Sequence, residues 1–258
     1  MWITRVERLE AATRGPRGVR VFAFDVEATV EGEVDPANGM VVNLTEMKET
    51  LRRDIVAAFS GRLLDGASGV PEYRTAEELA RGIWARLGGT LADRRLIRLR
   101  LRGAGPSVVE IQGDEFVDVT RSFEFSAAHR LHSPHLSDAD NVRVFGKCNN
   151  PAGHGHNYVL EVTLRGELDG NGEVFDAGTF DRVVHESVVD RWDHKNLNED
   201  LAEFRGVNPT AEEIVRIAWG RIRSALNEVA GGDGAVALHR LKLRETDRNH
   251  AEYFGDAS

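Results

Sequence analysis

The sequence predicts an α+β protein built from two copies of one ββααββ unit, each an antiparallel four-stranded sheet with two helices on one face. Three observations lead to this prediction: an internal repeat, strands with alternating apolar residues, and helices whose apolar residues recur every three or four positions. Alternating strands are typical of antiparallel sheets with one buried face, and helices that cover that face give the α+β class.

The repeat consists of five pairs of similar segments that keep their order along the chain. They are ITRVERLEAATR and VTRSFEFSAAHR (from Ile3 and Val119), FDVEATVEGEVD and YVLEVTLRGELD (from Phe24 and Tyr158), RTAEELARGIWARL and PTAEEIVRIAWGRI (from Arg74 and Pro209), LRLR and LKLR (from Leu99 and Leu241), and VEIQGD and AEYFGD (from Val109 and Ala251). The offset between the copies grows along the chain, as insertions would produce. We therefore expect a boundary near Gly113–Glu115, with a first copy at residues 1–114 and a second at 115–258.

In the second copy the strands are recognised by apolar residues at every second position. This alternation runs over Phe123–Ala127 in the first strand and over Leu160–Leu164 in the second. Two further strands are expected at Leu238–Glu245 and Ala251–Phe254, after the helices. One face of such a sheet is apolar and requires a cover.

Two helices are expected between these pairs of strands. The first runs from about Gly178 to Trp192 and has apolar residues on one face. The second begins at a T-x-x-E capping box formed by Thr210 and Glu213. Its apolar residues recur at a spacing of three and four, at Ile214, Ile217, Ala218, Ile222 and Leu226. Both helices can therefore cover the same face of the sheet.

Composition and charge exclude several classes of protein. The chain has 258 residues with 33 basic and 42 acidic side chains, and its net charge of −9 argues against a general nucleic-acid binder. No apolar run approaches the roughly 20 residues of a membrane span, and the N-terminus has no apolar leader, so we expect a cytoplasmic location. The single cysteine, Cys148, excludes an intrachain disulfide framework and a cysteine-rich zinc module.

Histidine is confined to the second copy. All nine histidines lie from His129 onward, and the lone cysteine lies there too. Histidines scattered over a surface would be divided between the two copies. We therefore expect the chemistry of this protein to lie in the second copy.

Three of these histidines are predicted to bind one metal ion. His154 and His156 are two residues apart at the start of the second strand, so their side chains point to the same face. His129 ends the neighbouring strand and shares the parity of its apolar residues. Three neutral imidazoles with an open fourth position are typical of a catalytic zinc site, and an all-imidazole shell favours Zn²⁺. An isolated H-x-H pair is, by contrast, more often two surface histidines.

The first copy serves as an internal comparison for this prediction. It carries Thr13, Arg20 and Phe22 at the positions that match the three histidines. All three candidate ligands are thus absent together, while the surrounding pattern of strands and helices persists. Histidines with a merely structural role would be expected to survive or to change one at a time, so the comparison favours a metal site.

Further reactive residues lie near these ligands in the sequence. Cys148 lies in a polar loop beside Lys147, and a neighbouring cation and a metal ion would lower the pKa of its thiol, although a free cysteine is usually a small buried apolar residue. Asp193 and His194 are adjacent at a predicted helix end, which alone is a common surface pairing. Glu245 ends a strand, where it could accept two N–H donors of an aminopyrimidinone or be a solvated turn acid.

Several segments of the second copy together resemble the 6-pyruvoyl-tetrahydropterin synthase family over residues 117–256. They are FSAAHRL, LSDADNVRVFGKCNNPAGHGHNY, GELD, WDHKNLN, PTAEE and ETD, in that family's order. The resemblance implies the tunnelling fold (T-fold), in which units assemble into homo-oligomers with active sites between subunits. It also implies conversion of 7,8-dihydroneopterin triphosphate to 6-pyruvoyl-tetrahydropterin with release of triphosphate.

The resemblance also implies roles for nine residues of this sequence. The zinc ligands it implies are His129, His154 and His156. The catalytic residues it implies are Cys148 as general base, with Asp193 and His194 as the proton relay in which His194 is the donor. The substrate-binding residues it implies are Glu245, which anchors the pterin ring, Thr210 and Glu212.

Two other functions stay open at this point. The related 6-carboxy-tetrahydropterin synthases of queuosine biosynthesis use the same substrate and a similar zinc site, but the long segment between Cys148 and the HGH pair favours the pyruvoyl product. A non-catalytic pterin- or zinc-binding T-fold protein is the other alternative. The first copy resembles a T-fold scaffold without an active site. We hypothesise that it takes the place of a neighbouring subunit, so that fewer chains complete the assembly.

Overall fold

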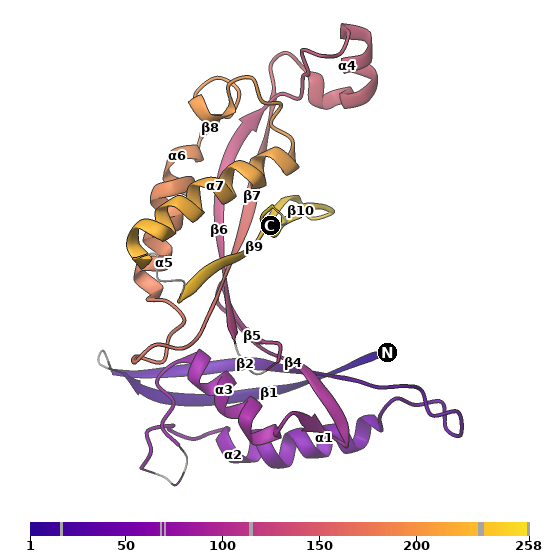
Figure 1. Ribbon diagram of the computed structural model, residues 1–258, viewed down its shortest axis with the longest axis vertical. Helices are drawn as coiled ribbons and strands as arrows, with labels where there is room; N and C mark the ends of the chain where they lie inside the picture. The colour runs from indigo at the N-terminus through magenta and orange to yellow at the C-terminus, as the bar shows by residue number, and fades with distance from the viewer. Residues whose placement is uncertain (16–17, 68, 70, 114–115, 232–234, 257–258) are drawn as a thin grey trace. The chain divides into compact units, whose positions relative to one another are not determined.

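The computed structural model describes the chain except for residues 16–17, 68, 70, 114–115, 232–234 and 257–258 (Figure 1). The described residues form two compact units, one of residues 1–120 and 165–175, the other of residues 121–164 and 176–258. The predicted boundary near Gly113–Glu115 includes Asp114 and Glu115, which lie outside the described residues. That boundary divides a sequence repeat, whereas the compact units follow packing, so the predicted division stays a prediction.

The described part of the first copy contains five strands and a set of helical segments. The strands are β1 (Trp2–Gly15), β2 (Gly18–Glu31), β3 (Thr90–Leu91), β4 (Arg94–Gly103) and β5 (Ser107–Ile111). The helical segments are α1 (Leu44–Leu51), the π-helical turn η1 (Arg52–Val56), α2 (Ala57–Phe59) and α3 (Ala76–Leu87). The main strands pair antiparallel in the order β1-β2-β4-β5, with β3 paired to β4.

The second copy repeats this order of elements with insertions. Its strands are β6 (Val117–His129), β7 (His154–Gly166), β8 (Lys195–Asn196), β9 (Val236–Thr246) and β10 (Asn249–Tyr253). Its helical segments are α4 (Asp138–Phe145), the 3₁₀ turns η2 (Gly146–Asn149) and η4 (Ala202–Phe204), α5 (Ala177–Val184), the π turn η3 (His185–Val189), α6 (Asp190–Trp192) and α7 (Ala211–Ala230). The strand order is β6-β7-β9-β10, and β8 adds a short parallel pairing to β6.

The helices α5, α6 and α7 of the second copy cover one face of its strands, as expected (Figure 1). Phe125 packs against Tyr158 and, edge-on, against Trp192 of α6, so the apolar face of β6 meets the helical layer. Of the predicted apolar stripe of α7, Ile217 is half-buried and the other four residues, Ile214, Ala218, Ile222 and Leu226, are buried. The predicted α+β class, with antiparallel strands and helices on one face, is confirmed.

The predicted helix limits agree closely with the structure. The expected helix from Gly178 to Trp192 is the continuous run α5, η3 and α6, interrupted only by its π-helical turn. Thr210 caps α7, because its Oγ1 accepts a hydrogen bond from the Glu213 N–H at 3.5 Å. The capping half of the predicted box is therefore present.

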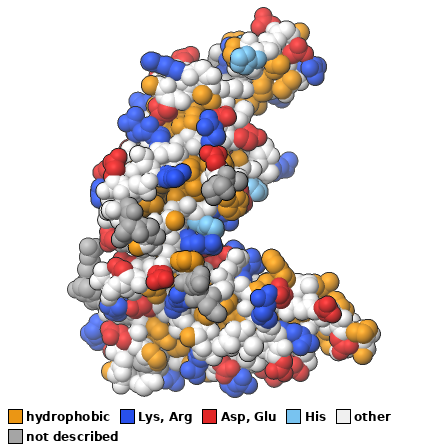
Figure 2. Space-filling model, in the orientation of Figure 1, with side chains coloured by type: hydrophobic (Ala, Val, Ile, Leu, Met, Phe, Trp, Pro, Cys, Tyr) orange, Lys and Arg blue, Asp and Glu red, His pale blue; other side chains and the backbone are white. Residues whose placement is uncertain are grey.

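The segment before Cys148 was expected to be a loop but contains the helix α4. Ser137 caps α4 by accepting the Asp140 N–H at 3.2 Å, and Asp140 in turn accepts from the Ser137 hydroxyl. An S-x-x-D capping box in the sequence therefore marks this helix start. Figure 2 shows hydrophobic side chains on this helix at the top of the molecule, and Val142 and Val144 are exposed.

None of the helices in the described part of the chain is long and apolar enough to cross a membrane.

Candidate metal centre and active site

The three predicted metal ligands meet at one end of the second copy's strands. His129 is the last residue of β6, and His154 and His156 are the first and third residues of β7. His129 Nε2 lies 3.0 Å from His154 Nε2, and one ligand nitrogen from each of the three rings lies within 4.8 Å of the others. In the described residues this is the group of side chains that could hold a metal ion.

The orientation of the His129 ring is fixed by a backbone carbonyl. His129 is almost fully buried, and its Nδ1–H donates to the Pro209 carbonyl oxygen at 2.8 Å. This bond places the proton on Nδ1 and leaves the Nε2 lone pair directed at the other two histidines. Such an outer hydrogen bond is what orients a metal-binding imidazole.

Burial keeps His129 and His154 neutral near pH 7. The pKa of His129 is lowered from 6.5 to about 4, chiefly by loss of hydration and also by the neighbouring His154 and His156, while the bond to the Pro209 carbonyl acts in the opposite direction. Burial also lowers the pKa of His154, with a smaller effect of His156 in the same direction. A metal ligand must be unprotonated, so these shifts favour metal binding.

The cluster contains buried nitrogen atoms that lack a hydrogen-bond partner. They are His154 Nδ1 and His156 Nε2. An unpaired polar atom in a protein interior is costly, and native structures rarely retain one without a reason. A metal ion within the cluster would satisfy one or more of these lone pairs. The donor set therefore fits a metal ion.

Glu245 lies beside the histidine cluster. Its Oε1 is 3.6 Å from His129 Nε2 and 3.7 Å from His156 Nε2, and its side chain is 19% exposed. Gly103 occupies the matching position of the first copy. Glu245 is thus within reach of whatever binds at the cluster, which its position in the sequence alone did not indicate.

Cys148 lies in the 3₁₀ turn η2, held next to the end of β6. The Leu131 N–H donates to the Cys148 carbonyl oxygen at 2.8 Å, and the cysteine is half-buried and free of any disulfide. The pKa of Tyr158 is raised by burial and additionally by the charges of Glu245 and Cys148. Tyr158 is fully buried beside the rings of His129 and His156.

Tyr158 was not identified as a site residue from the sequence. It has the same parity in β7 as His154 and His156, and this parity is the signal that could have indicated it.

Asp193 and His194 form a hydrogen-bonded pair at the end of α6. Asp193 Oδ1 accepts the Ser126 N–H at 2.8 Å, and its Oδ2 accepts His194 Nδ1–H, also at 2.8 Å. The hydrogen bond from the Ser126 N–H makes the largest contribution to lowering the pKa of Asp193, and the hydrogen bond from the His194 side chain also lowers it. The His194 N–H donates to the Ser126 carbonyl at 2.6 Å, and its backbone is left-handed with φ 58°. The His194 side chain itself is 81% exposed.

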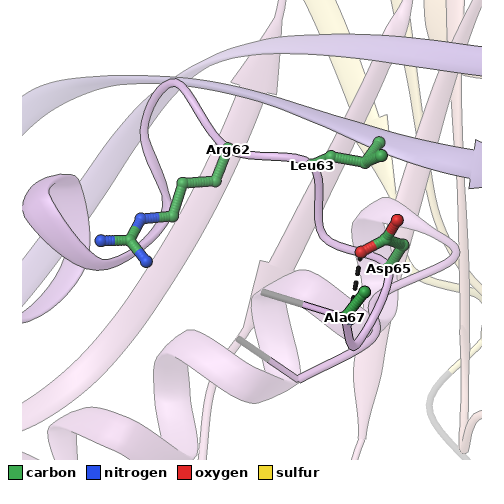
Figure 3. Close-up of a pocket in the computed structure, with 4 residues that line it drawn as sticks. All are labelled: Arg62, Leu63, Asp65 and Ala67. Atoms are coloured by element: carbon green, nitrogen blue, oxygen red, sulfur yellow. Dashed lines mark hydrogen bonds between the residues drawn. The ribbon is translucent and has the colours of Figure 1, made fainter. Parts of the chain in front are cut away.

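The first copy retains the backbone of this pair without its side chains. The Gly61 N–H donates to the Glu10 carbonyl at 2.7 Å, and Gly61 has φ +71°. Ser60 Oγ accepts the Glu10 N–H at 3.3 Å, as Asp193 accepts that of Ser126 in the second copy. A pocket of about 360 Å³ adjoins this segment. Figure 3 shows the residues that line it. Its lining consists of Arg62, Leu63, Asp65 and Ala67, with Asp65 Oδ1 accepting the Ala67 N–H at 3.1 Å.

Among the described residues, no hydrogen bond or ion pair joins the Asp193–His194 pair to a cluster histidine or to Glu245. The hydrogen bonds of the pair go to each other, to Ser126 and, from the Asp193 N–H, to the Val189 carbonyl. The role of the pair in the site stays a prediction.

The start of α7 adjoins the cluster through its backbone. Pro209, which receives the His129 hydrogen bond, directly precedes Thr210. The Thr210 side chain caps the helix, and Glu212 is exposed in its first turn. The structure therefore brings the start of α7, Glu245 and the three histidines to one place.

Comparisons with known proteins agree with this architecture. The model of the family "6-pyruvoyl tetrahydropterin synthase" matches residues 22–113 and again residues 118–256. The human 6-pyruvoyl tetrahydrobiopterin synthase is 39% identical over 139 residues, which cover 54% of this chain and 91% of that protein. The Drosophila melanogaster protein of the same name is 41% identical over 138 residues, 53% of this chain and 79% of that protein. The Aquifex aeolicus 6-carboxy-5,6,7,8-tetrahydropterin synthase is 29% identical over 160 residues, 53% of this chain and 96% of that protein.

One solved structure resembles about half of this chain, and another resembles its whole length. The Caenorhabditis elegans 6-pyruvoyl tetrahydropterin synthase matches 55% of this chain and 96% of its own with a TM-score of 0.50 and 39% identity. The uricase of Arthrobacter globiformis matches 100% of this chain and 94% of its own with a TM-score of 0.53, but at 11% identity this likeness concerns the fold alone. Because the family model matches two successive segments, the chain belongs to the 6-pyruvoyl tetrahydropterin synthase family and contains a tandem duplication of its fold.

Proposed function

We propose that this protein is a lyase of pterin biosynthesis that converts 7,8-dihydroneopterin triphosphate to 6-pyruvoyl-tetrahydropterin and releases triphosphate. The observation that supports this most is the three-histidine cluster, together with Cys148, whose carbonyl accepts the N–H of Leu131 two residues after His129. It lies in the segment that is about 40% identical to synthases named for this product. In this proposal the second copy, residues 115–258, is catalytic, and the first copy, residues 1–114, is a scaffold without metal ligands.

The metal in this proposal is Zn²⁺, held by His129, His154 and His156. Neutral imidazoles suit this ion, and the burial that lowers the pKa of His129 keeps that ring unprotonated. When bound, the ion would supply Lewis-acid polarisation of the oxygen atoms on the substrate's side chain.

The protein's own groups would move the protons. Cys148 would remove a proton from a side-chain carbon of the substrate, since a thiolate is a general base suited to neutral pH. His194 would return a proton, with its ring held by Asp193. Glu245, Thr210 and Glu212 would bind the pterin ring at the start of α7 and the end of β9. The reaction is an elimination with internal redox and needs no nicotinamide.

The exposed His194 leads us to propose a homo-oligomer with sites near subunit or repeat interfaces. Among described contacts the pair is separate from the cluster, and a neighbouring chain could present its own pair there. In this arrangement the first copy takes the place of a subunit. Analytical ultracentrifugation tests this proposal: an oligomer that carries the activity supports it, and a stable, active monomer contradicts it.

One assay tests the proposed reaction. The purified protein is incubated with 7,8-dihydroneopterin triphosphate and Zn²⁺, and both the pterin product and triphosphate are identified by mass spectrometry. We expect 6-pyruvoyl-tetrahydropterin from the wild type and a loss of triphosphate release in Cys148→Ala. His185→Ala is a matched control, because His185 pairs with Asp190 on an exposed part of the helical layer. A wild type that turns over no substrate would contradict an enzymatic role and favour a non-catalytic pterin-binding protein.

A second candidate activity is that of a 6-carboxy-tetrahydropterin synthase in queuosine biosynthesis. The similarity to the Aquifex aeolicus protein favours considering it, although at 29% identity it is weaker than the similarity to the pyruvoyl synthases. The same assay separates the two, because the pterin products differ in mass.

A further inference from the structure

The segment that follows His129 is held by three asparagines from three different parts of the second copy. We call Asn149, Asn198 and Asn208 the asparagine clamp. Asn198 Oδ1 accepts the Arg130 N–H at 2.7 Å, and its Nδ2 donates to the Arg130 carbonyl at 3.0 Å. Asn208 Oδ1 accepts the His132 N–H at 2.9 Å. The backbone of residues 130–132 is thus hydrogen-bonded on both sides.

The Arg130 side chain joins this segment to the turn that carries Cys148. Its Nε donates to the Asn149 carbonyl at 3.2 Å, and its Nη2 donates to Asn149 Oδ1 at 3.1 Å. His132 Nδ1 lies 3.1 Å from the same Oδ1 and can donate to it. Beside these contacts, the Leu131 N–H donates to the Cys148 carbonyl. Arg130 therefore donates to both oxygen atoms of Asn149, the residue next to Cys148.

Each asparagine of the clamp lies next to a different part of the candidate site. Asn149 adjoins Cys148, Asn198 belongs to the turn after the Asp193–His194 pair, and Asn208 adjoins Pro209, whose carbonyl orients His129. Asn149 is buried, and a buried polar network whose members are paired is rigid. The Arg130–His132 segment therefore connects the elements that must keep their mutual geometry during catalysis.

Among the described contacts of the first copy, this side-chain contact has no counterpart. The residue that matches Arg130 is Arg14, which is exposed near the end of β1. The contact thus accompanies the copy with the metal ligands, whereas a feature required for folding would be expected in both.

We infer that Arg130, acting through Asn149, is a positioning residue that fixes the Cys148 thiol relative to the histidine cluster. The catalytic consequence rests on the proposed function, but the structural consequence does not. The guanidinium acts by bridging two acceptors, so its geometry matters as well as its charge.

Three variants of the full-length protein test this inference. Arg130→Met removes the N–H donors and keeps a side chain of similar length. Arg130→Lys keeps the charge but cannot donate to two acceptors as the planar guanidinium does. Asn149→Ala removes the side-chain amide with its Oδ1 acceptor and keeps the backbone carbonyl. Arg14→Met is the matched control in the first copy. Amide hydrogen exchange of Leu131 and of residues 146–149 is measured without substrate, and kcat, KM and bound zinc are measured separately.

In Arg130→Met and Asn149→Ala we expect the Leu131 amide to exchange about tenfold faster, because the bond to Cys148 opens more often. We expect kcat to fall by about tenfold or more at a KM within about twofold of the wild type, with bound zinc unchanged. Arg130→Lys should resemble Arg130→Met, and Arg14→Met should resemble the wild type.

Two outcomes would overturn the inference. One is unchanged exchange in both Arg130→Met and Asn149→Ala, since the clamp would then not hold the turn. The other is an Arg130→Lys protein with wild-type exchange and kcat, since charge alone would then suffice. If the wild type turns over no substrate, the proposed function fails, but the exchange measurement still decides whether Arg130 holds the Cys148 turn.

Discussion

His129 combines in one side chain the features that distinguish a metal ligand from an ordinary buried histidine. One ring nitrogen donates to a carbonyl oxygen, and the other faces two more imidazoles. A structural histidine would satisfy both nitrogens with hydrogen-bond partners of the protein. Here the cluster instead retains buried, unpartnered nitrogens, which an ion could satisfy.

The burial of His129 predicts how the stability of the metal-free protein depends on pH. Below pH 6.5 the unfolded chain takes up a proton on this histidine, whereas the folded protein does so only near pH 4. Lowering the pH through this window therefore favours unfolding, by about 2 kcal/mol at pH 5. Urea unfolding of chelator-treated protein at pH 7 and pH 5 measures the effect.

The control for this pH dependence is His129→Gln, which has no titrating ring at this position. The wild type should lose more stability than the variant between pH 7 and pH 5. Equal losses would show that His129 titrates in the folded protein as it does in the unfolded chain.

His194 and Gly61 form a natural pair for testing backbone strain. Both have a left-handed backbone, and the backbone N–H of each donates a hydrogen bond to a carbonyl oxygen of the first strand of its copy. A side chain in this conformation costs about 1 kcal/mol relative to glycine. Since a Cβ on Gly61 would meet nothing within 4 Å, Gly61→Ala should lower the free energy of unfolding by about this amount through strain alone.

The converse substitution, His194→Gly, relieves the same strain but loses the hydrogen bond to Asp193. We expect little loss of stability together with a loss of the proposed proton donor. Urea unfolding and the triphosphate assay measure the two effects. A Gly61→Ala protein as stable as the wild type would show that a side chain in this left-handed conformation costs no free energy here.

At the scale of elements, the two copies share details that local sequence does not require. In each copy a π-helical turn joins two α-helical segments, Arg52–Val56 between α1 and α2 and His185–Val189 between α5 and α6. In each copy a threonine, Thr75 or Thr210, caps the long helix. In each copy the segment after the short helix pairs parallel to the first strand. The same fold therefore persists although the site residues differ.

The long helices of the two copies provide a matched test of packing. Gly82 of α3 leaves room for the Tyr73 ring, which a Cβ at this position would overlap. Gly220 of α7 has nothing within 4 Å of such a Cβ. Gly82→Ala should therefore lower the free energy of unfolding by about 1–3 kcal/mol, although alanine is the better helix former.

Gly220→Ala is the control and should raise the free energy of unfolding by up to about 1 kcal/mol, because only helix propensity changes. Chemical denaturation of both variants measures whether the free energy of unfolding falls in Gly82→Ala and rises in Gly220→Ala. A stabilised Gly82→Ala protein would show that the Tyr73 ring moves aside at no cost.

At the scale of the whole molecule, two repeats carry one candidate metal site. Within the described residues, the group that could hold an ion consists of His129, His154 and His156. The first copy has a threonine, an arginine and a phenylalanine at the corresponding positions. We therefore expect one tightly bound zinc ion per 258-residue chain.

Native mass spectrometry and elemental analysis measure this stoichiometry. Replacing one of three ligands should weaken metal binding by at least about 100-fold, so His156→Ala should be isolated without zinc. His185→Ala should retain one ion. Two ions per chain, or zinc retained in His156→Ala, would contradict a single site at this cluster.

Much of the architecture was determined by the sequence itself. The alternation in β6 and β7, the apolar stripe of α7 and its Thr210 cap are local patterns, and periodicity indicates them directly. The three metal ligands could also be predicted from the sequence, because residues of one parity on neighbouring strands share a face of the sheet. Comparing the two copies showed which copy carries them.

Tertiary structure alone decided how the site is assembled. Sequence spacing could not place Glu245 against the cluster, direct the Pro209 carbonyl to His129, or connect Arg130 to Asn149, since each contact joins segments that fold from distant parts of the chain. Local patterns determine strands, helices and faces, whereas distances between functional groups follow from the packing of those elements.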